Sequence, residues 1–290
     1  MAVGGVPCGV RPLALALPVL ALPVLALLVL AAPARADGPV RLQPGRALFM
    51  DAQGTPRVTG GTAKQVRARI NAALAAADAR LRAGMKRCMM VSSGLPDGPP
   101  STWQRTVSVT QAGPRWLSVL VSDDFYCGGA HPNNDVFPLV FDLRTGRPPD
   151  WTRLLPPALA GEAALDTAED GTPVGLVRSP ALLQLARGAA RPDCKDVLDA
   201  DSGRFVIWPE QGGLTAVIFG LAHVVQACAD GISLPAARLR ALGGAALADT
   251  LAPARRAPAP HAPATPAPTT SAPITLAAPP AAVPVQASPR

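Results

Sequence analysis

Residues 102–143, TWQRTVSVTQAGPRWLSVLVSDDFYCGGAHPNNDVFPLVFDL, decide the fold that the sequence predicts. Three runs in this stretch alternate apolar with polar residues, which is the pattern of a β-strand. The runs are separated by Gln-Ala-Gly-Pro at 111–114 and by a Gly- and Asn-rich loop at 128–134, both typical of turns. Because the loops are short, consecutive strands are expected to pair antiparallel, as a meander. The expected strands cover residues 102–111, 115–125 and 135–143.

A helix is expected on the N-terminal side of this sheet. Gly60 and Gly61 mark a turn, and Thr62 with Gln65 forms a capping-box pattern. The apolar residues that follow recur at helical spacing, and Gly84 is expected to end the helix. This apolar face consists of Val66, Ile70, Ala73, Leu74, Ala77, Leu81 and Met85. Short strands are expected on either side of the helix, at 46–51 and 87–92.

On the C-terminal side, a Pro-rich crossover follows the turn at Arg144-Thr145-Gly146. Ser179 and Pro180 predict a helix start, with an N-cap serine and proline at the first helical position, and the helix is expected to end near Gly188. Strands are then expected at 204–208, 214–219 and 231–234, and a final helix from Pro235. Residues 37–250 therefore predict one α+β domain: an antiparallel sheet with an N-terminal helix and short additional helices packed on it.

Both ends of the chain differ from this domain in composition. Residues 12–32 are uncharged and apolar, follow Arg11 and precede Ala34-Arg35-Ala36, so residues 1–36 predict a secretory signal peptide cleaved after Ala36. The alternative is a transmembrane anchor, which Pro18 and Pro23 disfavour. Residues 251–290 hold 11 prolines and no acidic residue, and predict a disordered tail. The expected location is periplasmic or secreted, and the processed protein is not expected to span a membrane.

The charge distribution argues against a nucleic-acid partner. The chain carries 27 basic and 20 acidic residues, a formal net charge of +7. Two basic residues lie in 1–36 and three in the tail, so residues 37–250 hold 22 basic against 20 acidic residues. A nucleic-acid-binding domain shows clustered basic residues, and this sequence predicts no such cluster.

The cysteines predict disulfides and not a metal site. Cys8 is expected to leave with the signal peptide, and the four that remain form an even set: Cys88, Cys127, Cys194 and Cys228. An even count in an exported protein argues for two disulfides. Three pairings are open, and joining sequence neighbours would staple each half of the domain. A zinc site is the alternative, but no C-x-x-C pair is present. Neither a metal nor a cofactor is expected.

The densest polar cluster, residues 123–135, is the candidate ligand-binding segment. Its oxygens suit a hard cation or sugar hydroxyls, with an aromatic ring as a stacking surface. The residues proposed to contact a ligand are Asp124, Tyr126, Gly128, Gly129, His131 and Asn133. The alternative is a structural hairpin loop in which the two glycines supply positive φ and the asparagines cap turns.

Candidate catalytic residues are few. His131 and His223 are the histidines of residues 37–250, and a hydrolase would rely on His131 with Asp124, but the G-x-S-x-G nucleophile motif is absent. His223 lies among apolar residues and is expected to be a hydrogen-bonded core or edge histidine. The segment 199–203 with Glu210 imitates part of a calcium loop, and a hairpin turn explains it better.

The run from Phe125 to Pro156 resembles the domain of unknown function that RsiV-type anti-sigma factors share with PdaC-type peptidoglycan deacetylases. The resemblance extends over most of residues 60–245, and its specific part is a GGAH loop, a strand that ends in a Phe-Asp pair and a TG turn. The matching residues are Tyr126, Gly128, Gly129, Ala130, His131, Phe141, Asp142, Leu143, Thr145, Gly146, Leu154 and Leu155.

The resemblance implies an extracytoplasmic domain that binds without catalysing a reaction. Its implied partner is cell-wall glycan or a lysozyme-like protein. Two alternatives remain: an envelope hydrolase that uses His131, and a structural envelope protein whose tail makes the contacts.

Overall fold

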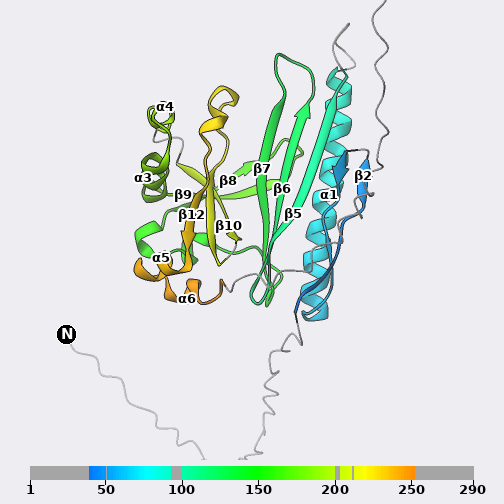
Figure 1. The fold of residues 1–290 in the computed structure, drawn as a ribbon. Helices are drawn as coiled ribbons and strands as arrows, with labels where there is room; N and C mark the ends of the chain where they lie inside the picture. Colours follow the sequence, from blue (N-terminus) through cyan, green and yellow to red (C-terminus); the bar gives the residue numbers. More distant parts are fainter. Residues whose placement is uncertain (1–38, 50, 93–99, 200–202, 211, 252–290) are drawn as a thin grey trace, which may run out of the picture. The chain divides into compact units, whose positions relative to one another are not determined.

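The computed structural model of the chain describes residues 39–49, 51–92, 100–199, 203–210 and 212–251 (Figure 1). The expected signal peptide lies outside these residues, and so does the expected tail apart from Leu251. That leucine is 3% exposed and belongs to the hydrophobic core. The described residues combine helices with two five-stranded sheets, so the predicted α+β class is confirmed.

The first sheet contains the predicted meander. Its strands, in spatial order, are β2 (Ala47–Phe49), β3 (Ala52–Gln53), β5 (Thr102–Ala112), β6 (Trp116–Tyr126) and β7 (Asn133–Asp142). β5, β6 and β7 pair antiparallel over nearly their full lengths, as expected from their alternation and short loops. β3 joins the sheet parallel to β5, with Ala52 opposite Arg105. A separate two-stranded ladder pairs β1 (Arg41–Gln43) with β4 (Arg57–Gly60).

Helix α1 (Lys64–Ser92) packs on one face of the first sheet, as predicted (Figure 1). Its Ile70 and Leu74 are fully buried in one cluster with Leu117, Val119 and Phe141 of β6 and β7. Trp116 and Val140 occupy the other phase of these strands and belong to the core that contains the second sheet. Both faces of β6 are therefore buried, which explains why apolar residues occur in both phases of this strand.

Three expectations about α1 and its start are wrong. The helix does not end at Gly84, and the expected strand 87–92 is its last part. A Cβ on residue 84 would lie 2.9 Å from Cα of Asp170, so this glycine lets the turn at 168–172 approach the helix and does not terminate it. Thr62 lies before the helix, and its hydroxyl donates to the carbonyl of Leu143 at 2.9 Å instead of forming the expected capping box.

The second sheet contains two strands that the sequence pattern missed. Its strands, in spatial order, are β12 (Ile232–Pro235), β11 (Gly213–Ile218), β10 (Arg204–Glu210), β9 (Pro173–Arg178) and β8 (Glu162–Thr167). β8 and β9 form a hairpin inside the expected Pro-rich crossover. β8 has no fully buried residue, so its sequence, Glu-Ala-Ala-Leu-Asp-Thr, lacks the apolar alternation that reveals a half-buried strand.

Short helices flank this sheet. They are α2 (Trp151–Leu154), η1 (Pro157–Leu159), α3 (Pro180–Ala189), α4 (Pro192–Lys195), η2 (His223–Cys228), α5 (Ala236–Ala241) and α6 (Ala245–Ala248). The predicted start of α3 is confirmed: Ser179 is the N-cap, and its hydroxyl accepts from the backbone N–H of Leu182 at 3.2 Å. The turn after α6 connects back to the first sheet, because Trp116 Nε1 donates to Thr250 Oγ1 at 2.8 Å.

Candidate functional site

The sequence-predicted binding residues lie at the end of the β6–β7 hairpin and in its loop. Gly128 and Gly129 have φ values of 91° and 102°, which other residues rarely adopt. The hydroxyl of Tyr126 donates to the carbonyl of Gly129 at 3.0 Å, and Asn133 Oδ1 accepts from the N–H of Asn134 at 2.9 Å. These contacts agree with the structural role considered for the loop, and they fix its conformation.

His131 of this loop and His223 come together on the exposed surface. Their rings stack with centroids 5.7 Å apart and an interplanar angle of 10°. His223 is the first residue of η2, and Gln226 of the same element donates from Nε2 to the carbonyl of Asn134 at 2.9 Å. His223 was expected to be a hydrogen-bonded core or edge histidine; it is exposed on η2, so it does not lie in the core. We call the loop residues 126–133 and His223 the hairpin-end surface.

Asp124 does not join the histidine pair. It is exposed on β6, opposite Asn134 in the ladder with β7. In the part of the chain that the structure describes, no hydrogen bond or ion pair connects Asp124 with His131. The pairing that a hydrolase based on these two residues would need is therefore not formed in this structure.

Two disulfides hold the hairpin-end surface from both sides. Cys88 near the end of α1 is bonded to Cys127 in the loop, and Cys194 of α4 is bonded to Cys228 of η2. Of the three possible pairings, the one between sequence neighbours is thus present. The first disulfide ties His131 to α1 through its loop, and the second ties η2, which carries His223, to α4. The two stacked histidines consequently lie on two segments, each of which is held by its own disulfide.

A buried charge cluster lies on the same strands. Arg105 of β5 donates from Nε to Asp123 Oδ1 at 2.6 Å and from Nη2 to Asp123 Oδ2, and Nη2 also donates to Asp170 Oδ2 at 2.6 Å. The three side chains are at most 1% exposed. Burial opposes the charge on Arg105. Its hydrogen bonds to the two carboxylates, and their electrostatic attraction, outweigh burial and hold its pKa above the ordinary value. Burial raises the pKa of Asp123, and Arg105 acts in the opposite direction.

Asp135 adds a third carboxylate to this cluster. It lies opposite Asp123 in the β6–β7 ladder, and its Oδ2 accepts from the N–H of Glu169 at 2.6 Å. Burial, followed by repulsion from Asp123, raises the pKa of Asp135 to about 6, although the Glu169 hydrogen bond works against this. One guanidinium cannot neutralise three carboxylates, so a proton on Asp135 relieves the excess negative charge.

Sequence reasoning missed three residues of this region. Asp170 and His223 arrive from distant segments, and no local pattern placed them near the hairpin. Arg105 did leave a signal, because it lies in the same strand phase as Trp103 and Val107, which are at least partly buried. A charged residue at an inward position of a strand indicates a buried ion pair.

No protein-family model matches the chain, and no curated protein matches it either. Within the described ranges, no three His, Cys, Asp or Glu side chains are grouped so that they can hold a metal ion. None of the helices in those ranges is both long and apolar enough to cross a bilayer.

Proposed function

We propose that this protein is an exported, non-catalytic binding domain that recognises the glycan of the cell envelope through its hairpin-end surface. The observation that carries the proposal is the exposed stack of His223 on His131, and His131 lies in a loop fixed by two glycines and a disulfide. Binding residues often lie on loops that a rigid scaffold positions. A loop already held in one conformation loses less entropy on binding than a mobile one.

The chemistry of the surface suits a sugar chain. The ring of Tyr126 and the two imidazoles offer flat faces, and Asn133 and Asp124 offer hydrogen-bonding groups on the same hairpin end. A few polar groups that orient a ligand next to apolar faces are typical of small-molecule sites. The disulfides support an oxidising compartment outside the cytoplasm, in line with the expected signal peptide. The resemblance to the domain in RsiV-type and PdaC-type proteins points to the same compartment.

Co-sedimentation with purified, insoluble peptidoglycan tests this function. The wild-type protein should be retained, and His131→Ala and His223→Ala should each lower retention about tenfold if the ring faces make central contacts. His261→Ala is the matched control, because this histidine lies in the expected tail and should be without effect. Thermal unfolding of each variant checks that the fold is intact.

Each other outcome of the assay contradicts the proposal in a defined way. Retention by immobilised lysozyme, and not by peptidoglycan, would favour the protein ligand that the resemblance also implies. Release of soluble sugar by the wild type, and not by His131→Ala, would favour the hydrolase. No retention by either ligand would remove the binding function.

A further inference from the structure

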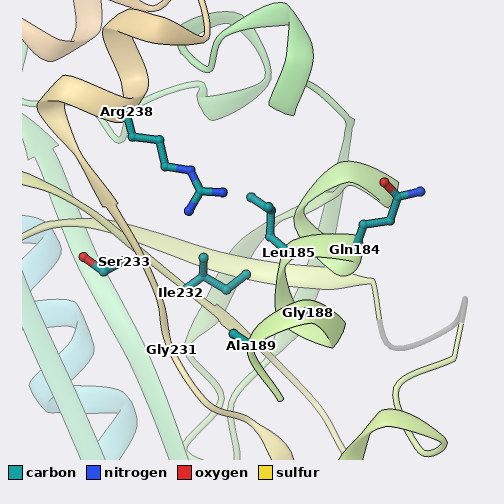
Figure 2. Close-up of a pocket in the computed structure, with 8 residues that line it drawn as sticks. All are labelled: Gln184, Leu185, Gly188, Ala189, Gly231, Ile232, Ser233 and Arg238. Atoms are coloured by element: carbon teal, nitrogen blue, oxygen red, sulfur yellow. The ribbon is translucent and has the colours of Figure 1, made fainter. Parts of the chain in front are cut away.

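A groove lies between α3 and the edge strand of the second sheet, formed by residues that do not belong to the hairpin-end surface. Its volume is about 360 Å³ (Figure 2). Figure 2 shows α3 on one side, β12 on the other, and Arg238 of α5 extending toward the space between them. The lining residues are Gln184, Leu185, Gly188, Ala189, Gly231, Ile232, Ser233 and Arg238.

Strand β12 offers unpaired backbone groups along this groove. It is the outer strand of its sheet, and β11 is its ladder partner among the described strands. Leu214 lies opposite Leu234 and Ala216 opposite Ile232, and next to them the N–H of Ala236 donates to the carbonyl of Gly212 at 3.1 Å. Hydrogen-bonded and non-hydrogen-bonded pairs alternate in an antiparallel ladder. The backbone groups of Ser233 therefore face the free edge, on the groove side.

The opposite wall carries small residues at the groove. Gly188 of α3 lines the groove, and a Cβ placed on it would meet no heavy atom within 4 Å. Ala189 beside it also has a small side chain. Leu185 and the buried Ile232 provide an apolar floor. A narrow apolar floor next to an open strand edge fits an extended peptide, whose alternate side chains enter the groove while its backbone pairs with the edge.

Arg238 gives the groove its charge preference. Its side chain is exposed and forms no ion pair within the described ranges, whereas Arg240 on the same helix is paired with Asp249. The eight lining residues include no Asp or Glu. Arg238 also comes after the last residue of β12, so its charge lies beyond the end of the strand edge. A carboxylate at the end of an added strand would complement it.

The geometry points to a binding site for an extended peptide that pairs with β12 as an additional strand and places its C-terminal carboxylate on Arg238. The occupant is another polypeptide with a free C-terminus. Main-chain hydrogen bonds to Ser233 and apolar contacts with Leu185 and Ile232 supply affinity. The guanidinium selects the chain end. This site is independent of the glycan proposal, because none of its residues belongs to the hairpin-end surface.

Selection from a library of random peptides displayed with free C-termini, on the full-length protein, tests the inference. Enriched peptides should bind, and converting their C-terminal carboxylate to an amide should weaken binding about tenfold. Arg238→Ala should weaken binding to a similar extent. Ser233→Pro should do the same, because it removes the outward N–H and leaves the ladder bonds of Ile232 and Leu234 in place.

Arg240→Ala is the matched control, since it removes a charge from the same helix outside the groove, and it should not change peptide binding. His131→Ala should not change it either. A lack of enriched peptides, or equal binding of the acid and the amide, would overturn the inference. It would also be wrong if peptides bound only after deletion of residues 252–290, because the chain's own tail would then be the occupant. If the wild type formed dimers and Arg238→Ala did not, the occupant would be a second copy of the chain, and the inference would be wrong.

Discussion

Arg105 and Asp170 form a hydrogen-bonded ion pair of 2.6 Å, although 65 residues separate them in the sequence and both side chains are fully buried. Arg105 lies on β5 in the first sheet, and Asp170 lies in the turn between β8 and β9 of the second sheet. The pair therefore anchors the β8–β9 turn to the first sheet. A second contact reinforces it, because Asp170 Oδ1 accepts from the N–H of Thr172 at 2.6 Å and so fixes the turn itself.

Replacing Arg105 with methionine should strongly destabilise the protein. The change keeps an apolar stem but leaves Asp123 and Asp170 buried without their cation, and breaking a buried ion pair in this way costs about 3–5 kcal/mol. Urea unfolding measures the loss. Asp249→Ala is the control, because it breaks an exposed ion pair with Arg240 that contributes roughly 1 kcal/mol or less. Equal losses for the two variants would contradict a structural role for the cluster.

The pKa of Asp135, raised to about 6, predicts a pH dependence of stability. The folded protein holds this proton more tightly than the unfolded chain does, so the stabilisation is complete below about pH 4 and is lost as the pH rises through 6. Asp135→Asn mimics the protonated form. It should match the wild type at pH 4 and be more stable at pH 7 by about 1–2 kcal/mol, after allowance for partial exposure of the side chain.

Urea unfolding at pH 4, 5, 6 and 7 checks this prediction. Asp124→Asn provides the control, since it makes the same change at an exposed site on the neighbouring strand. If Asp135→Asn loses stability at pH 7, the ionised carboxylate contributes more through its hydrogen bond from Glu169 than it costs through burial. The raised pKa would then not describe this site.

The parts of the fold that could be predicted from sequence are those in which one strand or helix carries its own pattern. β5, β6 and β7 have alternation and strong turn residues, and α3 has the Ser179-Pro180 start, so each was found close to its observed bounds. The sequence did not predict β8, because its side chains are exposed or only half-buried and so show no apolar alternation. The predicted end of α1 was wrong because Gly84 has a packing role that depends on Asp170, a residue 86 positions away.

The candidate site was predictable only in part, for a similar reason. The GGAH loop is continuous in sequence, and its two glycines do adopt the positive φ that the turn chemistry requires. His223, in contrast, reaches His131 through η2, and neighbouring residues give no indication of that contact. The pairing of cysteines likewise depends on which loops meet in space, so sequence left three possibilities open.

Removing the Cys88–Cys127 disulfide should loosen the loop that carries His131. The bond joins residues that are 39 positions apart, and a closed loop of that length contributes about 2–4 kcal/mol. The double variant Cys88→Ser and Cys127→Ser should lower the melting temperature and weaken retention by peptidoglycan. Replacing Cys194 and Cys228, which are 34 positions apart, should lower the melting temperature by a similar amount. Unchanged melting of both double variants would show that neither bond stabilises the fold.

Gly84→Ala and Gly188→Ala should have opposite effects, although both place alanine in an α-helix. Alanine is favoured over glycine in a helix by about 1 kcal/mol, and at Gly188 of α3 the new methyl group would meet nothing within 4 Å, so stability should rise by up to this amount. At Gly84 the methyl group would lie 2.9 Å from the backbone of Asp170, which cannot rotate away as a side-chain end can. Overpacking of this kind costs about 1–3 kcal/mol, so the variant should be less stable than the wild type by urea unfolding. A stabilised Gly84→Ala protein would contradict the close contact between α1 and the turn at 168–172.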